Sequence, residues 1–286
     1  MANLVEEAKC IMKKYGIRAN KDLGQNFLIN SEVVENIVNS SEISKEDMVI
    51  EIGPGLGTLT KYLLEKAGKV LCIELDKKMI EILEDRFKEC SNFEIINDDV
   101  LKVDLNKLIK ENKENENIKN VKIVANLPYY ITTPIIMKLL EERLDIESIT
   151  VMIQKEVADR LIEIPSGKNT GAITYTIYYY CDSEKIMEVP NSSFIPEPEV
   201  TSEVIKMKIR KEPVVKIENP KVMFMIIKSA FMQRRKTLLN ALTNAQVFIS
   251  KQEGIKILNK LGLSENVRAE NLTIENYAEL AKEISK

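Results

Sequence analysis

Short apolar runs alternate with amphipathic stretches through the first half of the chain. Five runs of five to seven residues are rich in Val, Ile and Leu, and most segments between them carry apolar residues at helical spacing. Such runs, separated by helices, are typical of parallel strands buried on both faces of a sheet. We therefore expect an α/β fold with strands at 48–53, 69–75, 93–97, 121–126 and 148–154.

The pattern changes toward the C-terminal end. Segments 185–190 and 200–210 alternate apolar and polar residues, so we expect them to form two closing strands. Beyond residue 212 the spacing is helical, which divides the chain into a domain at 1–212 and a smaller helical domain at 213–286. The segment 171–180 is ambiguous, because its β-branched and aromatic residues favour a strand. A polar stretch at 111–120 is expected to be a surface loop.

The bulk composition limits the possible chemistry. The 286 residues are 44% hydrophobic and 30% charged, as in ordinary globular proteins. No apolar run reaches the roughly 18 residues that span a bilayer, and a signal pattern is missing, so we expect a cytoplasmic protein without a membrane partner. The chain has no histidine and four widely spaced cysteines, which excludes histidine bases and most zinc sites. We expect no metal.

Charge is distributed unevenly along the chain. The net charge is −3, yet residues 206–240 contain ten Lys or Arg and two Asp or Glu, a local charge of +8. A basic segment on an acidic body is typical of a nucleic-acid docking surface, but a solvated charged face has the same composition. Charge alone leaves both interpretations open.

A glycine-rich turn follows the first predicted strand. The run EIGPGLGTLT (51–60) places Gly53, Gly55 and a third glycine where the backbone can approach a ligand closely. Glu74 ends the second strand, where an acidic side chain can accept hydrogen bonds from ribose hydroxyls. Together they predict a ligand that contains adenosine, without choosing between a nicotinamide dinucleotide and S-adenosylmethionine (SAM).

Two carboxylates follow the third predicted strand. Asp98 and Asp99 are both placed to reach an adenine amino group at the carboxyl edge of the sheet. Both residues also suit a turn or a helix cap. The sequence does not choose between them.

The tetrapeptide Asn126-Leu127-Pro128-Tyr129 follows the fourth strand and indicates the reaction. The lone pair of an adenine amino nitrogen is delocalised into the ring. Hydrogen bonds from its two protons to the Asn126 side-chain oxygen and a nearby backbone carbonyl would favour a more tetrahedral nitrogen, while Tyr129 stacks on the base. Attack on a sulfonium methyl then needs mainly positioning, at about 3–3.5 Å, and no strong base. These residues predict methyl transfer from SAM to an adenine amino group.

With these residues in view, the chain resembles the bacterial small-subunit (16S) ribosomal RNA adenine dimethyltransferases over nearly its whole length. The motifs that carry the resemblance occur in order: GQNFL (24–28), EIGPGLGTLT (51–60), IELD (73–76), DDVL (98–101), NLPYYITTP (126–134), FIPEPEVTS (194–202) and AFMQRRKTLLNAL (230–242). The resemblance implies a class I, Rossmann-like SAM-dependent methyltransferase sheet with a small all-helical C-terminal domain that binds RNA. It also implies that 171–180 is helical.

The resemblance further implies a substrate and a set of site residues. Two methyl groups are placed on N6 of each of two adjacent adenosines, in the hairpin loop near the 3′ end of small-subunit rRNA, within a 30S assembly intermediate. We expect a monomer. The implied cofactor residues are Gln25, Asn26, Leu28, Gly53, Gly55, Glu74, Leu75, Asp99, Val100 and Asn126. The implied acceptor residues are Asn126, Leu127, Pro128, Tyr129 and Phe194, with Phe194 stacking on the far face of the base. The implied RNA-binding residues are Arg234, Arg235 and Lys236.

Two positions depart from the family pattern. Glu199 stands where a basic residue is common, and Asp98 stands where a glycine is common, so Asp98 remains an alternative to Asp99.

The nearest alternative function is that of an antibiotic-resistance methyltransferase acting on large-subunit rRNA, but Leu127 and the run at 234–238 favour the small subunit. An NAD-dependent dehydrogenase would leave the Asn-Leu-Pro-Tyr motif unexplained. A non-catalytic ribosome-assembly factor on the same scaffold is a further alternative.

Overall fold

The protein is described by a computed structural model that covers residues 3–20, 23–115 and 118–285. The chain forms two compact units. Residues 1–158 and 183–209 make up the first, here called the sheet unit, and residues 159–182 and 210–286 make up the second, the helical unit. This division differs from a linear boundary at 212/213, because the chain enters the helical unit, returns to the sheet unit and leaves it again.

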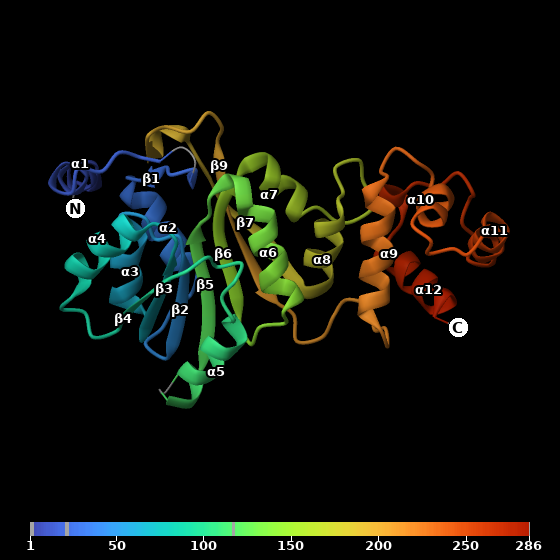
Figure 1. Ribbon diagram of the computed structural model, residues 1–286, viewed down its shortest axis with the longest axis horizontal. Coiled ribbons are helices and arrows are strands. Elements are labelled where there is room, and N and C mark those ends of the chain that lie inside the picture. Colours follow the sequence, from blue (N-terminus) through green and yellow to red (C-terminus); the bar gives the residue numbers. More distant parts are fainter. Residues whose placement is uncertain (1–2, 21–22, 116–117, 286) are drawn as a thin grey trace. The chain divides into compact units, whose positions relative to one another are not determined.

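The sheet unit is built on a mixed sheet of seven strands in the order β4-β3-β2-β5-β6-β9-β7 (Figure 1). The strands are β2 (Asp47–Ile52), β3 (Lys69–Glu74), β4 (Phe93–Asn97), β5 (Asn120–Asn126), β6 (Ser148–Gln154), β7 (Cys181–Val189) and β9 (Ser202–Ile209). The first five are parallel to one another, and β9 is antiparallel to β6. The predicted α/β fold and its closing strand pair are therefore confirmed.

The order of the strands creates a place for a ligand. From β2 the sheet grows in one direction through β3 and β4, and in the other through β5 and β6. In open α/β sheets, ligands bind beyond the carboxyl ends of the strands at such a reversal. The carboxyl ends of β2 and β5 therefore mark the expected location of the site.

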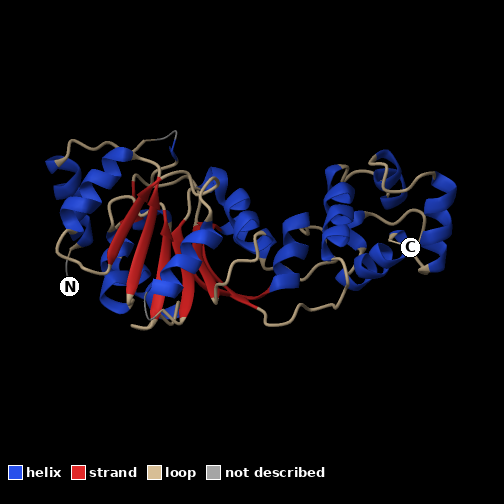
Figure 2. Ribbon diagram, turned by 60° about the horizontal axis from the view of Figure 1, so that its bottom comes forward, coloured by secondary structure: helices blue, strands red, loops and turns tan. Residues whose placement is uncertain are grey.

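Helices pack around the strands of the sheet unit (Figure 2). They are α1 (Leu4–Lys14), α2 (Ser31–Ser40), α3 (Thr58–Lys66), α4 (Lys77–Phe87), α5 (Leu105–Asn115), α6 (Thr132–Glu141) and α7 (Lys155–Leu161), of which residues 159–161 are grouped with the helical unit. Polar side chains start two of them: Asn30 accepts hydrogen bonds from the first turn of α2, and Asp76 accepts one from the Lys78 N–H of α4. Fully buried side chains such as Ile37, Leu63 and Ile82 hold α2, α3 and α4 in one core with the strands.

Helix α5 extends into a stretch that was expected to be a loop. Residues 111–115 are helical, while 116–117 lie outside the described residues. Two ion pairs at helical spacing, Lys107–Glu111 and Lys110–Glu114, each at 3.8 Å, favour the helix. The Asn112 side chain also donates to the Leu108 carbonyl at 2.9 Å. Local pairing of charges therefore extends the helix although the stretch is polar.

The helical unit contains α8 (Ala172–Tyr180), α9 (Pro220–Met232), α10 (Leu238–Asn244), α11 (Lys251–Lys260) and α12 (Ile274–Ile284). Segment 171–180 is thus mainly helical, as the family resemblance implied and against its β-propensity. The reason is tertiary packing, because Tyr175 is fully buried and donates from its hydroxyl to the Leu272 carbonyl at 2.6 Å. Its ring meets that of Tyr277 edge-on at 5.0 Å.

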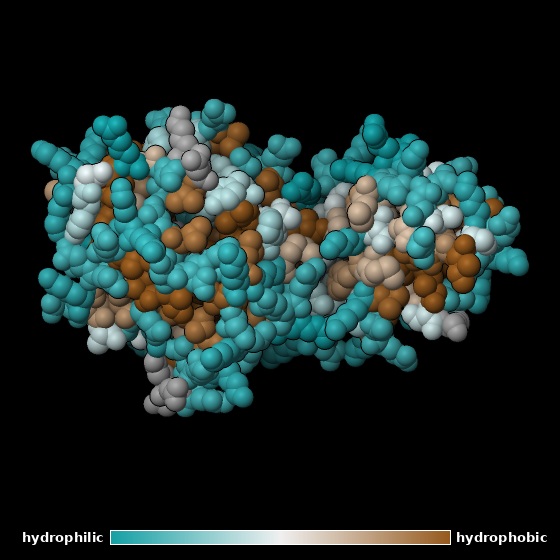
Figure 3. Space-filling model, in the orientation of Figure 1, coloured by the Kyte–Doolittle hydropathy of each residue, from teal (hydrophilic) through white to brown (hydrophobic). Residues whose placement is uncertain are grey.

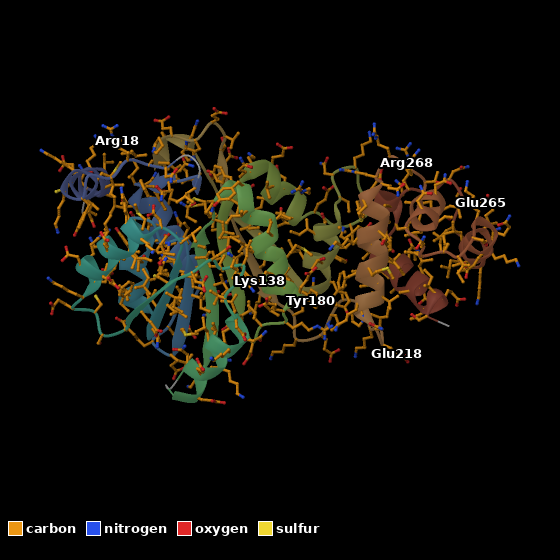
Figure 4. The ribbon with its side chains drawn as sticks, viewed as in Figure 1. Arg18, Lys138, Tyr180, Glu218, Glu265 and Arg268 are labelled. Carbon is orange, nitrogen blue, oxygen red and sulfur yellow. The ribbon has the colours of Figure 1, made fainter. Side chains whose placement is uncertain are left out.

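The C-terminal end of α8 is held by aromatic contacts with α9. Tyr180, labelled in Figure 4, stacks on Phe224 at a ring distance of 5.6 Å, and Tyr179 meets Phe224 edge-on at 5.2 Å. Aromatic pairs of this kind add roughly 0.5–1.5 kcal/mol beyond the area they bury. These contacts explain why residues 159–182 belong to the helical unit.

Hydrophilic side chains cover most of the face drawn in Figure 3, and apolar side chains appear between them in smaller groups. Among the helices of the described residues, none has both the length and the apolar content required to cross a membrane. The same part of the chain holds no cluster of three or more acidic or cysteine side chains suited to a metal ion.

Candidate active site

A cavity opens at the carboxyl ends of β2, β3 and β5, where the strand order reverses. It measures about 1070 Å³ including the solvent at its open side. It is lined by Leu23, Gly24, Gln25, Asn26, Phe27, Leu28, Glu51, Ile52, Gly53, Pro54, Gly55, Leu56, Thr58, Leu59, Ile73, Glu74, Leu75, Asp98, Asp99, Val100, Asn126, Leu127, Pro128, Tyr129, Tyr130, Ile131 and Ile135. Motifs that lie far apart in the sequence therefore meet at one site.

The glycine-rich turn brings backbone to the cavity wall. Gly53 and Gly55 have φ angles of 67° and 57°, in the left-handed region that side chains disfavour. Gly57 also has a left-handed φ of 79°, and in addition a Cβ there would lie 2.6 Å from Leu83 and 2.8 Å from Phe87. The turn thus offers bare backbone to a ligand on one side and packs tightly on α4 on the other.

The Glu74 carboxylate connects the end of β3 to the glycine-rich turn. Its Oε1 accepts hydrogen bonds from the N–H groups of Leu75 and Asp76, both at 2.9 Å, and its Oε2 accepts one from the Gly55 N–H at 3.3 Å. Burial raises the pKa of this carboxyl, while the three backbone donors act in the opposite direction. Glu74 lines the cavity with its position fixed by backbone on two sides.

The turn after β4 contributes a carboxylate and a free backbone donor. Asp99 accepts from the Leu101 N–H through Oδ1 at 3.0 Å, and its side chain is less exposed than that of Asp98. Asp98 accepts from the Asp99 N–H at 2.7 Å. The Val100 N–H donates to no group in the described part of the chain. Both aspartates line the cavity, so the geometry brings together the two candidates that the sequence left open.

Residues 25–28 form another wall of the cavity and are tied down at both ends. Gln25 donates to Asp76 at 2.9 Å, which links this segment to the start of α4. The two-residue strand β1 (Phe27–Leu28) pairs with β8 (Phe194–Ile195), with Leu28 opposite Phe194. The pairing joins the first and sixth motifs of the family pattern.

The Asn126 side chain is held in one orientation. Its Nδ2 donates to the Asn26 main-chain carbonyl at 3.3 Å, so its Oδ1 faces away from that carbonyl and accepts no hydrogen bond from a described residue. The Leu127 N–H donates to the Met152 carbonyl at 3.1 Å. The Pro128 carbonyl is occupied by two donors of the following turn, whereas the Leu127 carbonyl accepts none from the described residues. Two acceptors, the Asn126 Oδ1 and the Leu127 carbonyl, are therefore free.

Tyr129 begins the 3-10 helix η2 (Tyr129–Ile131) and is anchored through its hydroxyl. That hydroxyl lies 2.5 Å from the Ser202 hydroxyl at the start of β9. Burial raises the pKa of Tyr129, and the bond to Ser202 partly offsets this. Ser202 was missed as a site residue; its place at the end of the FIPEPEVTS motif was the available signal.

Phe194 does not line the cavity. Its side chain is 1% exposed and belongs to the core of the sheet unit beside Leu28 and Phe27. The structure therefore brings Asn126, Leu127, Pro128 and Tyr129 together at the cavity, but places Phe194 beneath its wall.

Glu51 is a further site residue that sequence reasoning missed. It is 1% exposed at the end of β2, lines the cavity and accepts a weak hydrogen bond from the Cys72 thiol at 3.6 Å. Burial raises the pKa of its carboxyl from 4.5 to about 7. An acidic residue inside the apolar run of a buried strand was the signal that could have revealed it.

We expect Glu51→Gln to increase the free energy of unfolding at pH 8 by about 3 kcal/mol and to change it little at pH 4. The folded state binds the Glu51 proton more tightly than the unfolded state, so this carboxyl lowers stability as pH rises from 4.5 to about 7. Urea denaturation at both pH values measures the difference, with the exposed Glu89→Gln as the matched control. An equal effect at both pH values would contradict the assignment.

The expected RNA-binding residues lie in the helical unit, between α9 and α10. Arg234, Arg235 and Lys236 are all exposed. The Arg234 guanidinium donates to the Lys168 carbonyl, which ties this turn to the loop before α8. Arg235 and Lys236 form no ion pair in the described part of the chain.

The sheet order, with the antiparallel β9 between β6 and β7, and the cavity beside the glycine-rich turn define a class I SAM-dependent methyltransferase. The profile of the family described as "Ribosomal RNA adenine dimethylase" matches residues 16–286. The chain belongs to this family, and its methyl donor is SAM.

Curated relatives and solved structures agree with this assignment. A ribosomal RNA small subunit methyltransferase A from Alkaliphilus metalliredigens is 48% identical and covers 98% of this chain and 96% of its own. The protein of the same name from Clostridium botulinum is 48% identical, with 96% of each chain covered. A dimethyladenosine transferase from Plasmodium falciparum superposes with a TM-score of 0.74 at 26% identity, covering 91% of this chain and 97% of that one. The 23S rRNA methyltransferase ErmE, at 20% identity and a TM-score of 0.65 over 91% of this chain and all of that one, shares the fold.

Proposed function

We propose that the protein transfers methyl groups from SAM to N6 of two adjacent adenosines in the 3′-terminal hairpin loop of small-subunit rRNA. The observation that carries the proposal is the arrangement of free acceptors at Asn126 and Leu127 beside the anchored ring of Tyr129. Relatives at 48% identity that are named small subunit methyltransferases support the choice of RNA. Such a substrate places the enzyme in the cytoplasm, on a 30S assembly intermediate, where we expect it to act as a monomer.

The residues at the adenosine end of the cavity fit SAM. The Glu74 carboxylate is placed to accept hydrogen bonds from the ribose hydroxyls. The apolar Leu75 side chain is 52% exposed at the cavity wall and covers one face of the adenine. The Asp99 carboxylate accepts a hydrogen bond from the adenine amino group, and the unpaired Val100 N–H donates one to a ring nitrogen of the adenine. We prefer Asp99 to Asp98 because its side chain is the less exposed of the two.

The methionine end of SAM is assigned to the backbone-rich wall of the cavity. Gly53 and Gly55 allow the ligand to approach their backbone, and Gln25, Asn26 and Leu28 cover it from the N-terminal segment. Bound SAM supplies the electrophilic methyl group on its sulfonium. Asn126 is assigned to both SAM and the acceptor adenine, because it lies on the cavity wall between their two proposed sites.

The acceptor base is assigned to Asn126, Leu127 and Tyr129. The Asn126 Oδ1 and the Leu127 carbonyl accept the two N6 protons, which directs the nitrogen lone pair toward the methyl group. Pro128 fixes the backbone between these groups, and the Tyr129 ring holds the plane of the base. The attacked nitrogen becomes cationic and readily loses its proton, so a chain without histidine can perform the reaction.

Phe194 is proposed to act on the far face of the base. Its side chain is buried against Leu28, so this contact requires the ring to turn outward from under the β1–β8 pair. Stacking of a flipped base between aromatic side chains is common in enzymes that modify nucleobases.

The alternative function is methylation of large-subunit rRNA. It is tested together with the proposal by incubating the protein with methyl-labelled SAM and either small or large subunits that lack these methyl groups. Label mapped as N6,N6-dimethyladenosine in the small-subunit 3′ hairpin is the expected result. Label only in large-subunit RNA would support the alternative function. No label in either RNA would refute both functions.

Replacing Arg234, Arg235 and Lys236 by alanine is expected to weaken binding to small subunits and to flatten its salt dependence. Each lost phosphate contact lowers the slope of log K against log salt by roughly 0.7–0.9, so the triple variant loses about 2–3. Binding at several salt concentrations measures this slope. The matched control is Lys251→Ala with Lys256→Ala on α11, which removes exposed cations of the same unit. An unchanged slope in the triple variant would refute the RNA-binding assignment.

A further inference from the structure

The aromatic ring of Tyr130 is exposed to solvent at the mouth of the cavity. Tyr130 lines the cavity, yet its side chain is 55% exposed. Among the cavity-lining residues, only Tyr130 and Leu75 are large hydrophobic side chains with this degree of exposure, and Leu75 is at the adenosine end. The Tyr130 hydroxyl has no hydrogen-bond partner among the described residues. Neither the cofactor assignment nor the acceptor assignment uses this ring.

The position of the Tyr130 ring is set by the backbone behind it. A Cβ built on Gly24 would lie 3.2 Å from the ring's Cδ1 and 3.5 Å from its Cε1. The ring therefore lies beside bare backbone, and a Cβ at Gly24 would be in tight contact with its edge. One side of the ring is supported by the segment that precedes Asn26, and the side chain remains accessible to solvent.

Tyr129 and Tyr130 diverge from one rigid turn. Both belong to the 3-10 helix η2, in which successive side chains are roughly 120° apart because a turn contains three residues. Tyr129 is directed to β9 by its bond to Ser202, so Tyr130 points in another direction. The turn presents two aromatic rings to two different places at the cavity mouth.

We propose that Tyr130 is a stacking platform for the nucleotide next to the target adenosine. The inference rests on the proposed function, in which two adjacent adenosines are modified. When one base enters the cavity, its neighbour loses a stacking partner, and an exposed aromatic ring at the mouth replaces it. Base–aromatic stacking contributes roughly 1–3 kcal/mol per base and is tolerant of the base's substituents.

The platform tolerates either methylation state of the neighbouring adenosine. Stacking uses the π face of the base and requires no N6 proton. An unmodified neighbour and a dimethylated neighbour can therefore both occupy Tyr130 while the other adenosine is in the cavity.

The test is a double-mutant cycle between the enzyme and its RNA. Small subunits are reconstituted with a synthetic 3′ segment that has either adenosine or an abasic residue beside one target adenosine. We expect Tyr130→Ala to lower kcat/KM on the normal RNA by about 10- to 100-fold, and Tyr130→Phe to retain nearly full activity. The abasic neighbour should lower the wild-type value by a similar factor and cause no further loss in Tyr130→Ala.

Three outcomes would overturn the inference, and they differ in meaning. Multiplicative losses from the variant and the abasic RNA would show that the two groups do not interact. A rise in the Kd for SAM in Tyr130→Ala that equals the loss of kcat/KM would make Tyr130 part of the cofactor wall. If the wild type does not methylate the normal small subunit, the proposed function fails and the inference fails with it.

Discussion

Replacing Asn126 by alanine is expected to reduce kcat by about 10³-fold while leaving the fold intact. Groups aimed at the reacting atoms of a substrate typically contribute 10²- to 10³-fold to the rate. Asn126 is oriented by its donation to the Asn26 carbonyl at 3.3 Å, which leaves Oδ1 free to accept an N6 proton. Alanine removes this acceptor and so leaves the lone pair of the adenine nitrogen delocalised into the ring.

The measurement is single-turnover methylation with small subunits, combined with calorimetric binding of SAM. Asn106→Ala is the matched control, since the Asn106 side chain also donates to a backbone carbonyl, that of Glu142, but does not line the cavity. The thermal unfolding temperatures of both variants should match that of the wild type. Full activity in Asn126→Ala would mean that the acceptor site lies elsewhere.

Replacing Glu74 by alanine is expected to raise the Kd for SAM by about 100-fold. The carboxylate holds the Leu75, Asp76 and Gly55 N–H groups at 2.9–3.3 Å and is assigned to the ribose hydroxyls. Hydrogen bonds to charged groups contribute roughly 1.5–3 kcal/mol each, so losing those to the ribose has a large effect. Kinetic constants for RNA at saturating SAM should change much less.

Two further variants separate binding from folding. Glu74→Gln keeps the size of the side chain but turns an amide N–H toward backbone donors, so we expect most of the loss in SAM affinity to remain. Glu81→Ala removes an exposed acid from α4 and should bind SAM like the wild type. An unchanged Kd in both Glu74 variants, measured by calorimetry, would exclude the ribose assignment.

Most of the sheet could be predicted from sequence because its signals are local. Aliphatic runs gave the five parallel strands, of which β2, β3, β5 and β6 are buried along nearly their whole length while β4 is a partly exposed edge strand. The glycines after β2 marked the turn at the cavity. Segment 171–180 could not be assigned from its own residues. Its β-propensity is overruled by the burial of Tyr175 against Tyr277 and Leu272, about a hundred positions further along the chain.

The location of a candidate site residue could be predicted where one short motif supplies both its chemistry and its position, while its role stays a prediction. Asn126 to Tyr129 and Glu74 meet at the cavity as expected. Ser202 and Glu51 were not found, because their roles depend on neighbours brought by other strands. The burial of Phe194 likewise follows from the pairing of β1 with β8, which no property of the single residue indicates.

The bond between Asn126 and Asn26 couples two binding equilibria. Residues 23–28 line the cavity, and the Asn26 carbonyl in the same segment orients the Asn126 amide, which is proposed to receive the adenine. A ligand that makes this segment more rigid therefore lowers the entropic cost of ordering the other site. Coupling of this kind is reciprocal, so SAM and RNA should each increase the affinity for the other by the same factor. S-adenosylhomocysteine, the product that SAM leaves in the same cavity, should in turn slow the dissociation of the methylated RNA for as long as it stays bound.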